Sequence, residues 1–252
     1  MPKIPLQLRG WQQMCQNYPD RAVADAIAGI VRFGARISFQ GKREGQHIPK
    51  NHVSADQLPE LLKENLCEQI DHDRLTIYQS AQTLPQNFYS SPLGLVNKPN
   101  GKKRRIHHLS HPPGKSVNDG IPIQFGEIHY SSVGEVITII QELGEGAVML
   151  KLDFADAFRQ IPVSPLDTPL LGFSFDDYFY AERFLPFGLH TAPYIFNLFA
   201  EVFHWILEQQ LQKICLNAHV MHYLDDFLVL LPPGTDWHPV SARFEQLAKL
   251  VG

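Results

Sequence analysis

Two adjacent aspartates, Asp225 and Asp226, interrupt the apolar stretch MHYLDDFLVLLP at residues 221–232. Burying an unpaired carboxylate is costly, and two neighbouring carboxylates also repel each other. Two interpretations fit this pair. The aspartates lie at the solvated tip of a hairpin turn, where Asp is common, or they hold a divalent cation such as Mg²⁺, which binds carboxylate oxygens. A third carboxylate elsewhere in the chain would favour the metal site.

That third carboxylate follows the segment GAVMLKL. The run AVMLKL predicts a buried strand, and Asp153 comes where this strand ends, a position that a rigid scaffold holds well. Asp156 would share a face with Asp153 if the next residues formed a helical turn. Asp153 also suits the cap of the following turn. Because acids end two separate strands, however, a shared metal site becomes the favoured interpretation.

A dense basic segment lies earlier in the chain. KPNGKKRR, residues 98–105, carries five cations between two strand-like runs, with a glycine-containing turn at residues 99–101. The pattern predicts a basic hairpin. An ordinary solvated turn and a phosphate-binding element both fit this segment.

Helical patterns surround these segments. Amphipathic spacing predicts helices over residues 24–34 and over residues 54–70, the latter with Ser54 and Gln57 at capping-box spacing. The segment 132–144 predicts a third helix that ends at Gly144, and the segment 38–52 predicts a loop.

A fourth helix is expected after Thr191 and Pro193. It is apolar nearly all round, so its aromatic residues are expected in the core rather than on a base-stacking platform. Its main stripe consists of Ile195, Phe199, Val202 and Ile206.

Composition limits the classes of protein that fit. With 252 residues, 44% of them hydrophobic, the chain can bury one large core or two modest ones. Three scattered cysteines argue against a disulfide framework, and no apolar run approaches the ~20 residues that span a bilayer. The start MPKIPLQLRGWQQ lacks the apolar core of a signal peptide, so we expect an intracellular protein, cytoplasmic or nuclear, with no membrane partner. The net charge of −4 argues against a generally basic nucleic-acid coat.

Two further motifs are weaker. The run HHLSH, with His107 and His108, could suggest a zinc site, but structural histidines are favoured because no second ligand cluster is evident. PPGKS is similar to the end of a phosphate-binding loop. Leu109 occupies the position of the first glycine of that motif, which excludes it.

Four motifs in order resemble a known family. SPLGLVNKPNGKKRR, KLDFADAF, LPFGLHTAPYIFN and YLDDFLVL resemble the fingers and palm motifs of reverse transcriptases, over roughly residues 55 to 245. The segments RIHHLSHPPGKSVNDGIP and HYLDDFLVL are most similar to DIRS-type retrotransposons, with the gypsy type next.

The resemblance implies two-metal phosphoryl transfer with two Mg²⁺ ions, or Mn²⁺ in their place. Asp153 and Asp225 match the two metal-bridging acids, and Asp226 matches their neighbour. Lys98 and Arg104 match the cations that contact the incoming triphosphate.

The resemblance also assigns the surroundings of the nucleotide. Phe158 matches the aromatic residue under the sugar, and Phe187 and Gly188 match the loop beside the nucleotide. Phe187 departs from the glutamine of retroviral enzymes, so base-pair contacts inferred from that glutamine do not carry over. The expected nucleic-acid contacts are Lys102, Lys103, Arg105 and Tyr223.

The expected fold is α+β: a right-hand polymerase with an antiparallel palm sheet and packed helices. Residues 1–80 would form a helical extension and the start of the fingers, residues 81–145 the fingers, and residues 146–252 a truncated palm without a thumb. The expected activity is RNA-directed DNA synthesis with an RNA or DNA template, a DNA primer and deoxynucleoside triphosphates, alongside the thumb and RNase H regions of a longer polyprotein. A non-catalytic nucleic-acid-binding remnant and a palm-type nucleotide cyclase are the alternatives.

Overall fold

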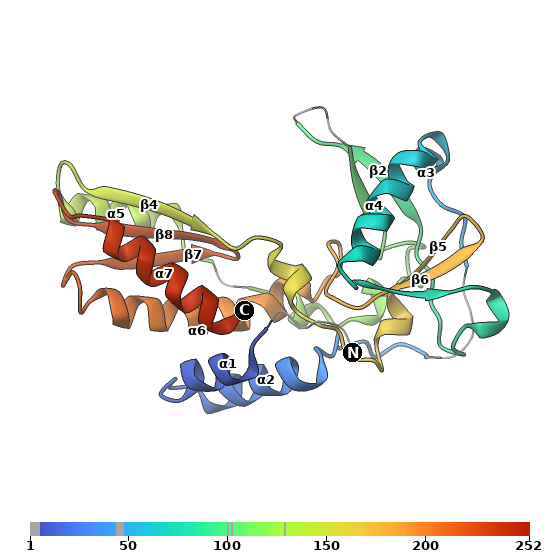
Figure 1. Ribbon diagram of the computed structural model, residues 1–252, viewed down its shortest axis with the longest axis horizontal. Helices are drawn as coiled ribbons and strands as arrows, with labels where there is room; N and C mark the ends of the chain where they lie inside the picture. The colour runs from blue at the N-terminus through green and yellow to red at the C-terminus, as the bar shows by residue number, and fades with distance from the viewer. Residues whose placement is uncertain (1–5, 44–47, 100, 102, 129) are drawn as a thin grey trace. The chain divides into compact units, whose positions relative to one another are not determined.

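The computed structural model describes residues 6–43, 48–99, 101, 103–128 and 130–252 (Figure 1). The chain divides into two compact units, and each is built from separate stretches of sequence. The first unit contains residues 33–127 and 158–192. The second contains the described part of residues 5–32 together with residues 128–157 and 193–252. These units do not follow the consecutive ranges 1–80, 81–145 and 146–252 that the sequence suggested, because the N-terminal helices group with the C-terminal strands.

The first unit combines short helices with two antiparallel sheets. Its helices are α3 (Val53–Gln57) and α4 (Pro59–Asp71). One sheet has the strand order β1-β6-β5, formed by Leu75–Tyr78, Tyr178–Glu182 and Gly172–Phe175. Fully buried leucines of α4 pack with strand residues in one hydrophobic core, which contains Leu62, Leu66, Leu93 and Phe173.

The basic hairpin is confirmed as a separate two-stranded sheet of this unit. Its strands β2 (Leu93–Asn97) and β3 (Lys103–His107) pair antiparallel, from Leu93 opposite His107 to Asn97 opposite Lys103. In Figure 1 the hairpin extends beside α3 and α4, and α3 contacts β2.

The second unit packs helices on an antiparallel sheet. The sheet has the order β4-β8-β7, formed by Val148–Asp153, Asp226–Leu231 and His219–Tyr223. The helices are α1 (Leu8–Cys15), α2 (Arg21–Phe33), α5 (Val133–Leu143), α6 (Ala192–Leu211) and α7 (His238–Val251).

An aromatic cluster joins α6 and α7 to one face of this sheet. Phe203 of α6 and Phe244 of α7 both pack against Phe227 of β8, with ring centroids 5.5 and 5.9 Å from that ring. Phe154, just after β4, contacts all three rings. These aromatic rings pack together at one point and so help to hold the strands against the two helices.

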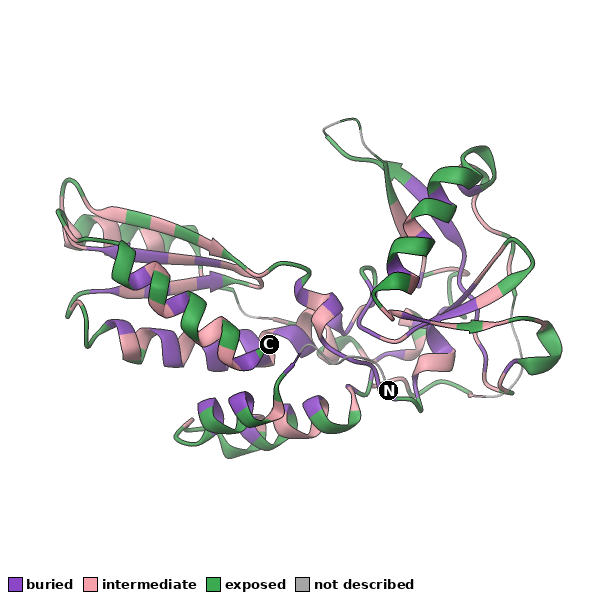
Figure 2. Cartoon of the chain, viewed as in Figure 1, coloured by how far each residue is buried: buried purple, intermediate pink, exposed green. Residues whose placement is uncertain are grey.

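Several predictions from the pattern are confirmed. The predicted helix α5 ends at Gly144, whose φ of 89° suits glycine, and it begins with a capping box between Ser132 and Glu135 that was not predicted. The predicted stripe of α6 is buried, from Val202 at 0% exposed to Ile206 at 9%, so its aromatic residues belong to the core. Figure 2 shows buried residues along most of α6.

The helix predicted over residues 54–70 is interrupted. Leu58 separates α3 from α4, and Pro59 begins the second helix, where its missing N–H costs little. Ser54 therefore caps no helix. Its Oγ accepts a hydrogen bond from the Leu95 amide of β2 instead, at 3.0 Å.

Two expectations around the first acid are wrong. The strand β4 is not buried: its residues alternate between half-buried and exposed, because it lies at the edge of a three-stranded sheet (Figure 2). Asp156 does not share a helical face with Asp153. It lies in a turn with a φ of 55°, outside the right-handed helical region.

No helix in the described part of the chain is long and apolar enough to cross a bilayer.

Candidate active site

The three predicted acids meet at one end of the second unit's sheet. The strands β7 and β8 are joined by the two-residue turn Leu224–Asp225, and Leu224 has a φ of 55°. Asp226 opens β8 and pairs directly with Asp153 of β4. The aspartate pair therefore lies at a hairpin turn, as the first interpretation expects, and the third carboxylate that the metal interpretation needs stands beside it, while metal binding itself stays a prediction.

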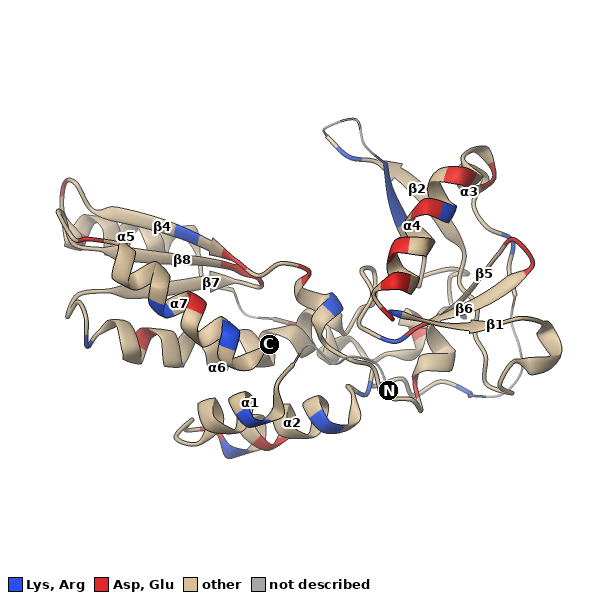
Figure 3. Cartoon of the chain, viewed as in Figure 1, with Lys and Arg blue, Asp and Glu red and all other residues tan. Residues whose placement is uncertain are grey.

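The acids repel one another. The pKa of Asp225 is raised by burial and by the neighbouring charges of Asp153 and Asp226, while its backbone hydrogen bond and Lys151 oppose the rise. The Lys151 ammonium of β4 lies 3.0 Å from Asp226 Oδ1, and both side chains are largely exposed. Figure 3 shows acidic residues gathered at this end of the strands, with a basic residue on β4.

This donor set fits a hard divalent cation. Three carboxylates on two paired strands supply oxygen ligands, and a dication would remove the repulsion that raises the pKa of Asp225. The oxygens of the three aspartates do not form such a tight group. Among the described residues, the three potential ligands whose atoms all lie within 4.8 Å of one another are Glu201, His204 and His222.

A cavity of about 340 Å³ opens beside Asp226 in the same unit. Its wall includes Lys151, Tyr223 and Asp226 together with the start of α5 at Ser132. Tyr223 is 55% exposed and stacks on Tyr130, with ring centroids 4.2 Å apart. Tyr223 is paired with Asp226 across the hairpin, and its contact with nucleic acid stays a prediction.

The basic hairpin of the first unit exposes three of its predicted cations. Lys98, Lys103 and Arg104 are all exposed, and the Lys103 ammonium donates a hydrogen bond to Asn97 Oδ1 at 2.8 Å. Their exposure leaves these cations accessible to phosphate groups. Lys102 lies outside the described residues.

Arg105 departs from its predicted role as a nucleic-acid contact. Its side chain is only 10% exposed and forms an ion pair with the fully buried Glu182 at 2.9 Å. Its Nε donates to Asn65 Oδ1, and Arg159 reaches the second oxygen of Glu182 at 2.8 Å. Alternation along β3 turns Arg105 inward and Arg104 outward, so adjacent arginines serve different purposes.

His107 belongs to the same buried network and is a structural histidine. Its Nε2 lies 3.0 Å from the Gly172 carbonyl, and burial lowers its pKa to about 4. Burial alone would raise the pKa of Glu182, but Arg159 and Arg105 outweigh it and hold that pKa at about 2. The network therefore contains a neutral imidazole and an ionised carboxylate at pH 7.

The residues assigned to the nucleotide surroundings lie together in the first unit. The rings of Phe158 and Phe187 have centroids 5.3 Å apart, and Phe187 is 54% exposed. Gly188 has a φ of 92°, which favours glycine, and its carbonyl accepts a hydrogen bond from Asn118 Nδ2 at 2.8 Å.

Sequence reasoning missed Asn118. Its Nδ2 binds the Gly188 carbonyl and its Oδ1 accepts from the His190 amide, so one side chain fixes both sides of Leu189. The only signal in the sequence was a turn-forming Asn-Asp-Gly run at residues 118–120. That run predicts a turn, but it does not predict a hydrogen bond to a residue 70 positions away.

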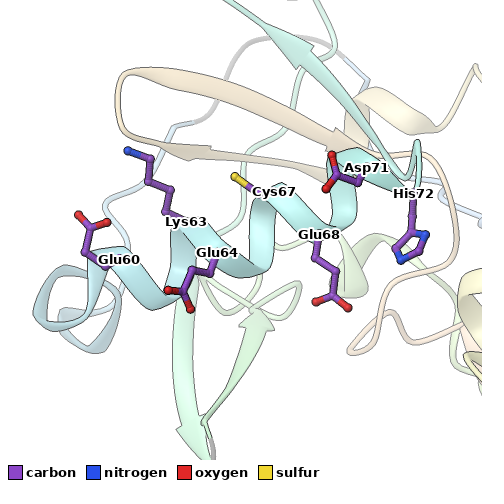
Figure 4. A pocket seen from close by; sticks show the side chains of 7 residues that line it. All are labelled: Glu60, Lys63, Glu64, Cys67, Glu68, Asp71 and His72. Atoms are coloured by element: carbon purple, nitrogen blue, oxygen red, sulfur yellow. The ribbon is translucent and has the colours of Figure 1, made fainter.

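A second hollow lies along α4 and has the wrong charge for phosphate (Figure 4). Four acids and only one lysine are among its lining residues, which are Glu60, Lys63, Glu64, Cys67, Glu68, Asp71 and His72. We therefore assign it no role in binding nucleotide or nucleic acid.

Comparisons with known proteins point to one family. Residues 96–249 match the family model described as reverse transcriptase (RNA-dependent DNA polymerase). The retrovirus-related Pol polyprotein from transposon opus of Drosophila melanogaster is 27% identical over 192 residues, which cover 73% of this chain and 17% of that protein. The genome polyprotein of Petunia vein clearing virus (isolate Shepherd) is 28% identical over 117 residues, which cover 46% of this chain and 5% of that polyprotein.

A solved structure supports the fold. The foamy viral protease–reverse transcriptase in complex with double-stranded DNA superposes with a TM-score of 0.56 at 14% identity, covering 96% of this chain and 40% of that one. The chain thus spans less than half the length of each of these relatives. The antiparallel sheets and packed helices are those of a polymerase of the fingers-and-palm type. Because the family model covers more than half of its residues, the chain belongs to the reverse transcriptase family.

Proposed function

We propose that the chain carries the catalytic part of an RNA-directed DNA polymerase. The observation that supports this most directly is the register of the second unit's sheet, which pairs Asp153 with Asp226 and sets Asp225 in the adjoining turn. Three carboxylates in this arrangement suit two-metal phosphoryl transfer, which depends on positioning and charge neutralisation.

Each predicted residue has a distinct part in the proposed reaction. Asp153, Asp225 and Asp226 would hold two Mg²⁺ ions, or Mn²⁺, which supply positive charge for the attacking and leaving oxygens when bound. Lys98 and Arg104 contact the triphosphate, where the planar guanidinium suits phosphate geometry.

The aromatic residues of the first unit select and orient the nucleotide. Phe158 lies under the sugar and excludes a 2′-hydroxyl, while Phe187 and Gly188 form the loop beside the base. Asn118 supports this proposal, since it donates to the Gly188 carbonyl and accepts from the His190 amide and so fixes the loop in which Gly188 lies.

The proposed partners are an RNA or DNA template, a DNA primer and deoxynucleoside triphosphates. The foamy viral enzyme is in complex with double-stranded DNA, which supports the proposal that this chain binds nucleic acid. Since the matching polyproteins are several times longer than this chain, we also propose that thumb and RNase H regions of a longer polyprotein work with it. We propose that the chain comes from a retrotransposon, with the DIRS type favoured and the gypsy type as the next choice.

A primer-extension assay tests the proposal. The chain is incubated with an RNA template, a DNA primer, deoxynucleotides and Mg²⁺, and binding is followed in parallel by fluorescence anisotropy. We expect extension by the parent and a loss of about 10²-fold or more for Asp225→Asn, as when a charge-stabilising group is removed. Asp25→Asn, at an exposed position of α2, is the matched control and retains full activity.

The other outcomes are distinct. Binding by the parent without extension would identify a non-catalytic remnant, and release of a cyclic nucleotide would identify a cyclase. Equal extension by Asp225→Asn and the parent would show that the metal assignment is wrong.

A further inference from the structure

A second group of potential metal ligands lies in the second unit, apart from the three aspartates. Glu201 and His204 are three residues apart on α6, so they share one face of that helix. His222 comes from β7. One ligand atom from each of these three residues lies within 4.8 Å of the others.

The two imidazoles already point at each other. His204 Nδ1 lies 2.8 Å from His222 Nδ1, and Glu201 Oε1 lies 3.8 Å from the other nitrogen of that ring, Nε2. An ion would use one nitrogen of His222, so with Nδ1 as the ligand the half-exposed Glu201 side chain would turn toward it. Two imidazole nitrogens on a tetrahedral Zn²⁺ are about 3.3 Å apart, given Zn–N bonds of about 2.0–2.1 Å. A separation larger by about half an ångström would therefore admit the ion.

Further groups hold these side chains in place. Asn197, one turn before Glu201, has its Oδ1 3.3 Å from His222 Nε2. The Val220 backbone hydrogen-bonds to His204, and the His222 ring stacks on Phe227 with centroids 5.3 Å apart. Outer contacts of this kind orient metal-binding imidazoles in known sites.

Burial and charge are also suitable. His222 is 8% exposed, whereas the Glu201 side chain is 45% exposed and leaves one side open to solvent. Burial lowers the pKa of both histidines, that of His222 to about 4, so both rings are neutral and have a lone pair at pH 7.

We propose that Glu201, His204 and His222 bind a divalent transition-metal ion of the Zn²⁺ class. Two nitrogen donors and one carboxylate suit zinc, whereas Mg²⁺ prefers oxygen ligands throughout. The ion links α6 to β7 and completes its coordination with water from the open side. The site lies on the opposite face of the sheet from Asp226, because His222 alternates with Tyr223, the residue paired with Asp226.

The place of this site gives it a structural consequence. His222 is three residues before Asp225 on the strand that leads into the turn. A metal tether between α6 and this strand stabilises the base of the β7–β8 hairpin without contacting the nucleotide. Zinc binding therefore stabilises the second unit independently of polymerase activity.

Metal titration of the whole 252-residue chain tests the proposal. All proteins carry Cys67→Ser to remove the exposed thiol, lack a histidine tag and are first stripped with a chelator. Zn²⁺ affinity is measured by competition with a chromogenic chelator, and Co²⁺ reports coordination through its visible absorption bands. We expect one tight site per chain, a higher melting temperature with Zn²⁺, and no effect of Mg²⁺ on this site.

Three variants separate this site from background binding. Glu201→Gln and His204→Asn are expected to weaken Zn²⁺ binding by at least about tenfold, since loss of even an outer contact has that effect. His219→Asn is the matched control, because His219 lies on the same strand and on the other face. It retains parental affinity.

Asp225→Asn addresses the possibility that zinc binds at the aspartates, and it also retains parental affinity for Zn²⁺. Parental affinity in Glu201→Gln, which is nearly isosteric and half exposed, would overturn the proposal. So would the absence of a tight site in the parent, or equal loss in His219→Asn.

Discussion

At the scale of single residues, Asp225 combines a catalytic assignment with an unfavourable environment. Its pKa is raised mainly by burial and further by Asp153 and Asp226. A carboxyl with a raised pKa binds its proton more readily in the folded state, so the free energy of unfolding falls as pH rises from its ordinary value of 3.8 through the raised one. At neutral pH the ionised group therefore destabilises the fold.

Asp225→Asn is accordingly expected to raise the melting temperature in the absence of Mg²⁺. Because the side chain is partly exposed, solvent screens the repulsion and the rise is small, about 2 °C. Differential scanning calorimetry in a chelating buffer measures it, and added Mg²⁺ should stabilise the parent but not the variant. A lower melting temperature for the variant under chelation would contradict this account.

Phe158 is expected to control the choice of sugar. Its ring packs against Phe187, so truncation opens space at that point without removing a charge or a hydrogen-bonding group of the side chain. Phe158→Ala should raise ribonucleotide incorporation relative to deoxyribonucleotide by about tenfold or more, with some loss of overall rate. Single-nucleotide extension with matched ribo- and deoxyribonucleotides measures the ratio, and Phe39→Ala controls for loss of an aromatic ring elsewhere in the unit. An unchanged ratio would make Phe158 a packing residue only.

At the scale of elements, the contact between β3 and β5 makes stability depend on pH. His107 of β3 is neutral in the fold because burial lowers its pKa from 6.5 to about 4, while the unfolded chain takes up a proton near 6.5. Its contribution is therefore present above 6.5 and is lost as pH falls toward 4. At pH 5 the loss from this residue alone is about 2 kcal/mol relative to pH 7.5.

Urea unfolding of the parent and of His107→Gln at pH 7.5 and pH 5 measures this effect. Glutamine can still donate to the Gly172 carbonyl but does not titrate, so the variant should lose about 2 kcal/mol less than the parent on acidification. His238→Gln, at an exposed position, should leave the parental loss unchanged. If all three proteins lost the same free energy of unfolding between pH 7.5 and pH 5, His107 would not be the cause of the pH dependence. The contribution of Glu182 to the free energy of unfolding is lost at lower pH, as the pH falls from the ordinary pKa of 4.5 to the folded pKa of about 2.

The elements themselves show what the sequence can predict. Where local chemistry decides the outcome, as at the glycine end of α5 at Gly144 and in the pairing of β2 with β3, prediction succeeded. Each of these depends on a few neighbouring residues, and the same few residues act in the fold. The acids were also identified from their types and positions at strand ends, although their pairing in space needed the sheet register.

Failures arose where distant partners decide the outcome. Arg105 looked like one more surface cation, yet Glu182, 77 positions later, draws it inside. Ser54 looked like a helix cap, but its Oγ accepts a hydrogen bond from the Leu95 amide instead. Strand β4 looked buried because its residues are apolar, and only the strand order shows that it lies at an edge. No local pattern carries that information.

At the scale of the whole molecule, charge is distributed unfavourably for a nucleic-acid-binding protein. The net charge is −4, the α4 face is acidic, and Arg105 is engaged in an ion pair. On the described part of the basic hairpin, the exposed cations are Lys98, Lys103 and Arg104. Affinity for a primer–template duplex comes mainly from neutralised phosphates, so few contacts mean weak binding.

We therefore expect this chain to bind primer–template weakly, with a Kd of about 10⁻⁶ M or higher at physiological salt. The logarithm of the binding constant should fall against the logarithm of salt concentration with a slope near about −3, for three phosphate contacts. Arg104→Ala should reduce that slope by about 1, and Lys249→Ala, on the exposed side of α7, should not change it. Fluorescence anisotropy over a salt series measures both, and nanomolar binding by the parent at physiological salt would contradict the expectation.

The open edge of β4 has a consequence for handling the protein. An edge strand with exposed apolar side chains, such as Met149 at 60%, invites pairing with a strand of another copy and so promotes aggregation. Lys151 and Asp153 are the charges on this strand that oppose such pairing. The carboxylate assigned to metal binding is thus also expected to oppose aggregation, so neutralising Asp153 should increase light scattering of the concentrated protein as well as affect the metal site.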